Sequence, residues 1–184
     1  MRYIYLLLFP LFLAFQLHAE SIKSEFYIPT YGIAVSIPGD WERRQLSDSG
    51  VIFTAFQKTT RNTIGVLAFA PPSPGIDLTR KGLDKSFSDA LGSYGRIIDR
   101  KDTTFLGKRA YAIIASADFQ GLKASIIRIY SEELLQGYYF QVQYSIIDAA
   151  LFPSNDVDTL AGFISIKKAE PVAPAQPPPA DSLK

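Results

Sequence analysis

The sequence contains no cysteine, and its only histidine, His18, lies close to its start. Without cysteine the chain can form no disulfide and carries no lipid-acceptor thiol, so packing alone must hold its fold. The residues after His18 also lack the imidazole that most often serves as a general base and as a metal ligand. These absences argue against catalysis by a Ser–His or Cys–His pair and against a zinc or copper site.

The first nineteen residues have the pattern of a removable export signal. Arg2 supplies a positive charge, an apolar run covers residues 3–15, and the small residue Ala19 precedes Glu20. The apolar run is shorter than the about 20 residues of a membrane-spanning helix. We therefore expect cleavage after Ala19, loss of His18, and a mature protein with no membrane span in the periplasm or another extracytoplasmic space. A retained leader acting as an anchor is the alternative.

An excess of one charge is also absent. The leader holds one of the 19 basic residues and none of the 18 acidic residues, so the mature chain keeps 18 of each. Nucleic-acid-binding proteins usually show a basic excess on one face, and anionic membranes attract basic segments. The balance argues against both kinds of partner.

Composition divides the chain into three regions. We expect a leader at 1–19, one folded domain at 20–168, and a tail at 169–184 that is rich in proline and alanine. Such a tail is typical of an extended, disordered segment with polyproline character. We interpret it as a spacer or frayed end, and a docking ligand for a proline-recognising partner is the alternative.

Alternating apolar and polar residues predict seven short strands in the domain. Their ranges are 33–37, 51–57, 63–70, 96–106, 109–118, 122–131 and 138–145. Several of these strands are apolar on both faces, which is typical of strands that are covered on both sides.

Two segments show helical spacing of apolar residues instead. The first carries a stripe from Leu83 to Tyr94, with Asp77 or Thr79 as its cap and Gly95 at its end; the second covers 155–164. Together with the strands, they predict an α+β fold, a three-layer α/β/α sandwich around a mainly antiparallel sheet of about six to seven strands.

Three sequence features have the order of a known family. The stretch YGIAVSIPGDW is an expected strand with Pro38 and Trp41 at its end. Two strands, a helix ending near Tyr94 and a meander follow it, and the stretch LAGFISIKK covers the end of the last expected helix and its exit. In its opening strand, its order of elements and its last helix, the chain resembles the PsbP-like superfamily, which includes a lumenal photosystem II protein, DcrB-like envelope proteins and a Ran-binding nuclear import factor.

This resemblance covers roughly residues 28–168 and implies an α/β/α sandwich. It implies little about activity, because members are mostly non-enzymatic accessory proteins with unrelated partners. The lipid-acceptor cysteine of the DcrB-like lipoproteins and the metal-associated histidines of the photosystem proteins have no counterparts in this chain.

Residues that could carry chemistry mostly have structural explanations. Ser165 and Lys168 form a Ser-x-x-Lys pair, but at the expected end of a helix and without the companion motifs of Ser–Lys enzymes. Trp41, at a strand end, suits core packing. Acids at strand ends and loops could form a glycosidase-like pair, but such acids ordinarily solvate turns; they are Asp118, Glu132, Glu133 and Asp148. Asn155, Asp156 and Asp158 suit a helix start, with a weak calcium site as the alternative.

The last predicted hairpin carries the main site hypothesis. If its loop covers Glu132 to Gly137, Ser131 pairs with Tyr138. The polar and aromatic residues that then share one face are Arg128, Tyr130, Tyr139, Gln141 and Gln143, with Arg128 opposite Gln141, Tyr130 opposite Tyr139 and Ile126 opposite Gln143. Tyr and Arg are enriched at protein contacts, and a few convergent polar groups are typical of ligand pockets. A partly exposed stripe of long side chains is the alternative.

These observations predict an exported, non-catalytic binding or accessory protein of the cell envelope that contacts a protein partner or a small ligand. We predict no catalytic residue, no metal ligand and no cofactor. The alternatives are a carboxylate-dependent hydrolase and a photosystem-type assembly subunit linked to calcium.

Overall fold

The computed structural model describes residues 23–44, 50–71, 77–147 and 156–167. The predicted leader and the proline-rich tail lie outside these residues, as do Asp148, Asn155 and Lys168. Within the described ranges, no helix combines the length and the apolar character needed to cross a membrane.

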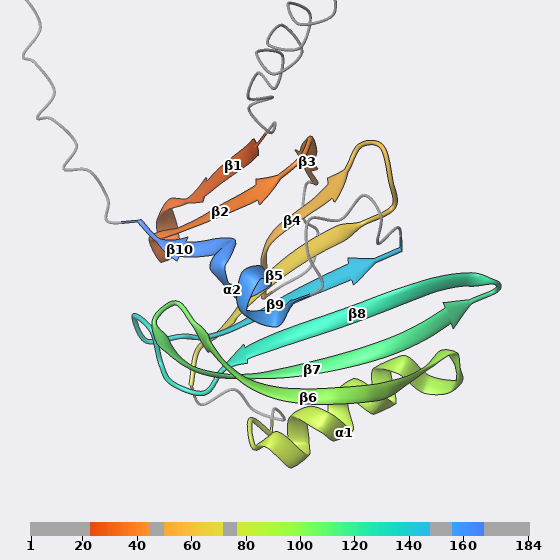
Figure 1. Cartoon of the computed structure of the whole chain (residues 1–184). Helices are drawn as coiled ribbons and strands as arrows, with labels where there is room; N and C mark the ends of the chain where they lie inside the picture. The colour runs from red at the N-terminus through yellow and green to blue at the C-terminus, as the bar shows by residue number, and fades with distance from the viewer. Residues whose placement is uncertain (1–22, 45–49, 72–76, 148–155, 168–184) are drawn as a thin grey trace, which may run out of the picture.

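One large antiparallel sheet of seven strands organises the described chain (Figure 1). From edge to edge its strands are β3 (Trp41–Arg43), β4 (Val51–Gln57), β5 (Thr63–Phe69), β9 (Tyr139–Ile146), β8 (Leu122–Ser131), β7 (Lys108–Phe119) and β6 (Gly95–Phe105). Six of the seven predicted strands are therefore found in this sheet. The central neighbours β5 and β9 are far apart in sequence, so this pairing joins the first hairpin to the later meander.

The remaining predicted strand belongs to a second, smaller sheet. Its antiparallel order is β1 (Lys23–Ile28), β2 (Ile33–Pro38) and β10 (Ile164–Ile166), and a short 3-10 turn, η1 (Pro29–Tyr31), joins the first two strands. The isoleucines and valine that predicted β2 are completely buried, because this sheet packs against one face of the large sheet.

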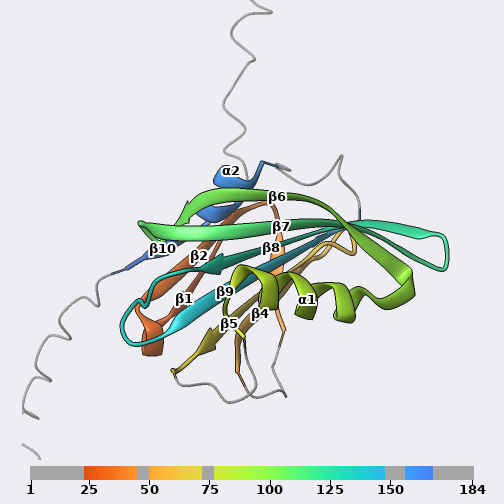
Figure 2. The same cartoon turned by 90° about the horizontal axis from the view of Figure 1, so that it is seen from below.

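Helix α1 (Arg80–Leu91) covers the opposite face of the large sheet (Figure 2). Both predicted capping residues take part at its start: the Thr79 hydroxyl accepts from the Gly82 amide at 3.1 Å, and Asp77 accepts from the Thr79 amide at 2.9 Å. The predicted stripe ends earlier than expected. Tyr94 lies in a 3-10 turn, η2 (Gly92–Tyr94), and is 56% exposed rather than buried.

The second helix, α2 (Val157–Gly162), is shorter than predicted, because Ile164 leaves it to begin β10. Its buried residues, Val157, Leu160 and Ala161, join the core beneath the small sheet. The Tyr144 hydroxyl of β9 donates to the Leu160 carbonyl at 2.7 Å, and burial raises the pKa of this tyrosine. α2 is thereby fixed to the large sheet.

Two apolar clusters fill the opposite sides of the large sheet. One lies between that sheet and the layer formed by the small sheet and α2, and the other lies under α1. The consecutive apolar residues of β7 explain the arrangement: Ala112 faces the first cluster, and Tyr111 and Ile113 face the second. The fold is therefore α+β, as predicted, but a small sheet with a short helix forms the layer opposite α1, where the sequence predicted a helix alone.

Candidate functional site

The predicted face of β8 and β9 exists, but the predicted pairing is wrong by two residues. The structure pairs Arg128 with Gln143, where Gln141 was predicted. It pairs Tyr130 with Gln141 instead of Tyr139, and Ile126 with Ser145 instead of Gln143. The cause lies in the connection, where Leu135 bridges Tyr138 across a tight turn and the Ser131 hydroxyl accepts from the Phe140 amide at 2.7 Å. Because side chains alternate with a period of two, an even shift leaves the same residues on the same face.

This face points toward α1, and Arg128 connects the two. Its Nε donates to the Gln143 side-chain oxygen at 2.6 Å, and its guanidinium lies 4.2 Å from the centre of the buried Phe87 ring. Such a cation–π contact strengthens when it is shielded from water. Arg128 and Gln143 therefore hold α1 against the sheet and do not line the cavity described next.

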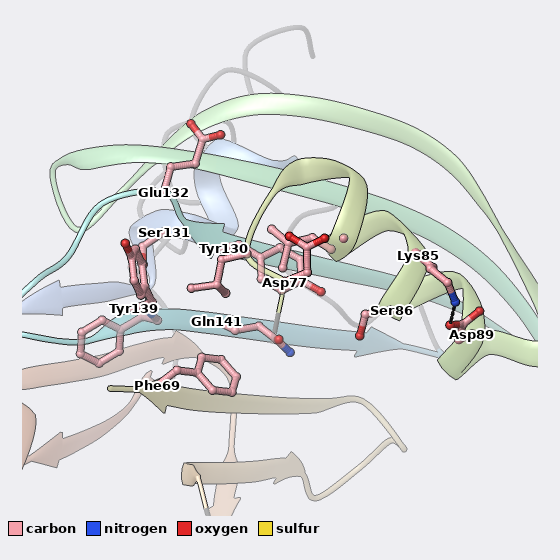
Figure 3. Close-up of a pocket in the computed structure, with 14 residues that line it drawn as sticks. Phe69, Asp77, Lys85, Ser86, Asp89, Tyr130, Ser131, Glu132, Tyr139 and Gln141 are labelled. Carbon is pink, nitrogen blue, oxygen red and sulfur yellow. Dashed lines mark hydrogen bonds and ion pairs between the residues drawn. The ribbon is translucent and has the colours of Figure 1, made fainter. Parts of the chain in front are cut away.

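A groove of about 420 Å³ runs between α1 and the face of β8, β9 and β5 (Figure 3). The predicted residues Tyr130, Tyr139 and Gln141 line it. The other walls come from β5, α1 and the residues before it, and include Phe69, Leu78, Lys85 and Ser86. The structure thus brings three of the five predicted residues into one concave site.

Gln141 is the least expected feature of this groove. Its side chain is only 9% exposed, and among the described residues it makes no hydrogen bond. Figure 3 shows its amide directed into the groove. No fully buried side-chain nitrogen or oxygen of the described residues lacks a hydrogen-bond partner, so the Gln141 amide reaches the open space of the groove, where a ligand can replace water as its partner.

A second hollow of about 320 Å³ continues the groove past Tyr139. The two hollows share residues of both walls, namely Leu78, Ser131, Glu132 and Tyr139. The site is therefore elongated, and its walls combine aromatic and apolar surface with a few polar groups, as ligand sites usually do.

The carboxylates around the groove are already engaged. Glu132 pairs with Arg80 at 2.6 Å, and Arg80 also pairs with Asp102; these two acids raise the pKa of Arg80. Hydrogen bonds from Thr79 lower the pKa of Asp77, and Asp89 pairs with Lys85. Each acid has a structural partner, and burial raises the pKa of Tyr130, one of the two tyrosines that line the groove.

The acidic residues at the start of α2 are engaged in the same way. Asp156 caps α2 by accepting from the Thr159 amide, which is the main reason that its pKa is lowered. Asp158 accepts from Thr103 and pairs with Lys101, and both contacts lower its pKa. The Lys101 ammonium group thus pairs with the two carboxylates that a calcium ion would have to bind in the calcium alternative. Among the described residues, no cluster of three or more His, Cys, Asp or Glu could hold a metal ion.

The remaining sequence candidates are structural where they are described. Trp41 is 4% exposed and donates from its indole nitrogen to the Pro38 carbonyl at 3.0 Å, so it packs in the core as predicted. Ser165 lies on β10, not at a helix start. Asp118 accepts from the Gly121 amide in the β7–β8 turn, and Glu133 pairs with Lys108 and Arg109.

Four groove residues were not predicted from the sequence, namely Phe69, Leu78, Lys85 and Ser86. Phe69 joins the site because β5 pairs with β9, which places it opposite Tyr139. Nothing local in the sequence indicates this pairing. The spacing of apolar residues predicted which side of the helix is buried. It did not predict which strands lie opposite the polar side of the helix across the groove.

The position of Arg128 leads to a testable prediction. Arg128→Ala is expected to lower the free energy of unfolding by about 2 kcal/mol, because it removes a charged hydrogen bond and a cation–π contact. Urea unfolding would measure the loss. The exposed Arg96 supplies the control, since Arg96→Ala removes the same charge without these contacts. Full stability of Arg128→Ala would contradict its role in holding α1.

The fold and groove together define an α+β protein with an open site beside its covering helix. No family model matches the sequence, and no curated protein matches it. Among solved structures, the fold is similar to the Ran-binding protein Mog1p of Saccharomyces cerevisiae, with a TM-score of 0.50 and 7% identity, covering 71% of this chain and 79% of that one. At this identity the likeness shows a shared fold alone.

A weaker match is LpqN, a Mycobacterium tuberculosis protein involved in cell envelope biogenesis. The TM-score is 0.45 and the identity 15%, covering 80% of this chain and 91% of LpqN. A Pseudomonas aeruginosa protein of unknown function, PA94, matches with a TM-score of 0.37 and 11% identity, covering 70% of this chain and 85% of that one.

Proposed function

We propose that this chain is a non-catalytic binding protein of the cell envelope, and that the groove between α1 and the sheet binds a segment of a protein partner or a small ligand. The observation that carries the proposal is the Gln141 amide, which makes no hydrogen bond to another described residue and opens onto an elongated groove with tyrosine and apolar walls. Such a group fixes the orientation of a ligand that the apolar walls hold.

Two further observations support binding rather than catalysis. The acids around the groove are committed to Arg80, Lys85 and the cap of α1, so none is placed as a free acid facing a second one across the groove. Mog1p, which has the same fold, is a Ran-binding protein, so the fold serves protein binding in that case. The proposed envelope location rests on the export-signal pattern of residues 1–19.

Variants of the groove test this proposal. Tyr139→Ala and Gln141→Ala are each expected to weaken binding about tenfold or more, the usual effect of truncating a central contact residue. Quantitative mass spectrometry after cross-linking in the native envelope would compare what each variant captures. A genuine partner must bind the original protein and be lost from both groove variants.

Tyr94→Ala supplies the matched control, because Tyr94 is an exposed tyrosine outside the groove, where it packs against Phe119 at 5.8 Å. It should retain every partner. If both groove variants capture the same molecules in the same amounts as the Tyr94→Ala control, the groove is not the binding site.

A further inference from the structure

The described chain ends on the face of the large sheet opposite the groove, next to the β8–β9 connection that lies at one end of the groove. The Lys167 amide donates to the Gly32 carbonyl at 2.8 Å, and a side chain added at Gly32 would meet Gln136 at 3.2 Å. Gln136 belongs to the β8–β9 connection, between the groove residues Ser131 and Tyr139. Figure 1 shows β10 ending at the same side of the molecule as this connection.

Ring contacts strengthen this link between the exit and the groove. Tyr31, next to Gly32, lies edge-on to Tyr138 with ring centres 5.0 Å apart, and Tyr138 precedes the groove residue Tyr139. The chain that continues beyond Lys167 therefore starts at the end of the large sheet where the groove begins, and it has to pass the β8–β9 connection to reach the α1 face.

The continuing chain has the composition of a groove ligand. Pro171, Pro174 and Pro177 repeat every third residue. A polyproline II helix has three residues per turn and a rise of about 3.1 Å per residue, so these prolines would form one edge of such a helix. Aromatic-lined grooves bind this kind of edge, and the free backbone carbonyls of the ligand accept hydrogen bonds from side chains in the groove.

We propose that residues 171–179 of this chain occupy the groove, with the proline edge on Tyr139 and Phe69 and with the Gln141 amide donating to a backbone carbonyl. This inference deepens the proposed function, on which it rests. The tail would act as a tethered competitor that an external partner must displace. Because the tether is short, the tail has a high effective concentration at the site, and weak contacts suffice.

The cysteine-free sequence permits a direct test in the full chain. One variant carries Ser86→Cys, at the exposed α1 wall of the groove, and Ala175→Cys in the tail. The control carries Thr30→Cys, an exposed position two residues before the Gly32 contact with Lys167, together with Ala175→Cys. Disulfide closure in a glutathione buffer is followed by mass spectrometry.

Docking is expected to make the Ser86 pair close about tenfold faster than the Thr30 pair. An undirected tail would give the opposite order or equal rates, because Thr30 lies next to the tail exit. Adding Gln141→Ala, or replacing Pro171, Pro174 and Pro177 by alanine, should remove the advantage. Pro178→Ala, which lies off the proline edge, should keep it.

Other outcomes overturn the inference. Equal rates, or closure mainly between two molecules, would exclude the chain's own tail as the occupant. If the Ser86 pair shows no advantage while Tyr139→Ala still loses partners that Tyr94→Ala retains, only the tail inference fails and the proposed function stands. If both tests fail, the groove has neither role.

Discussion

Replacing Phe87 by alanine is expected to lower the free energy of unfolding by about 3–5 kcal/mol, the usual cost of truncating a buried aromatic residue. Phe87 is 1% exposed and lies between Leu83 and Leu91 on the buried side of α1. It also provides the ring under the Arg128 guanidinium. Because the groove exists only where α1 lies against the sheet, the same change should abolish binding there. Urea unfolding and the capture experiment measure the two effects.

Ser88→Ala is the matched control for this prediction, since Ser88 is the exposed neighbour of Phe87 on the same helix. It should change stability by less than about 0.5 kcal/mol, as surface substitutions usually do. Wild-type stability in Phe87→Ala would show that α1 is not held by this contact. In that case the groove would need another explanation.

Replacing Asn62 by alanine is expected to cost about 3 kcal/mol, because it removes two hydrogen bonds made by a completely buried side chain and takes away the side-chain acceptor of the Ile147 amide. Asn62 is completely buried at the turn between β4 and β5. Its side-chain oxygen accepts from the Ile147 amide at 2.7 Å, and its side-chain nitrogen donates to Gln57 at 3.0 Å. The residue thus joins the first hairpin to the end of β9. Thermal or urea unfolding would measure the loss.

The neighbouring Arg61 is exposed and supplies the control. Arg61→Ala should leave the unfolding midpoint nearly unchanged. A loss of less than about 1 kcal/mol in Asn62→Ala would mean that water replaces the missing amide, which the complete burial of Asn62 argues against.

The strands could be predicted because their signal is local. Alternation along Val51–Gln57 and Thr63–Phe69 matches burial that alternates along the same residues in the structure. Adjacent apolar residues such as Ile126 and Ile127 correctly indicated strands covered on both faces, since these two join the two different clusters. The stripe of α1 was correct as far as Leu91, where the 3-10 turn ends its period.

The site could be predicted only in part. Arg128, Tyr130 and Gln141 share a face because side chains alternate along a strand with a period of two. A register error of two residues therefore leaves them on the same face. The partners across the hairpin depend on the geometry of its connection, where the Leu135–Tyr138 bridge takes the place of the simple loop that was predicted. Asn62 lies at the turn between β4 and β5 and is buried because the end of β9 reaches it from far along the chain.

Periodicity and composition by themselves determined seven of the ten described strands, the buried stripe of α1 as far as Leu91, and where the proline-rich stretch of the sequence lies. Tertiary structure alone decided that β2 leaves the main sheet, that β5 pairs with β9, and that Gln141 meets α1 across a groove. The physical reason is the range of the interactions. Alternation arises between neighbours in the chain, whereas strand order and the walls of a groove arise from contacts between segments that are far apart in sequence.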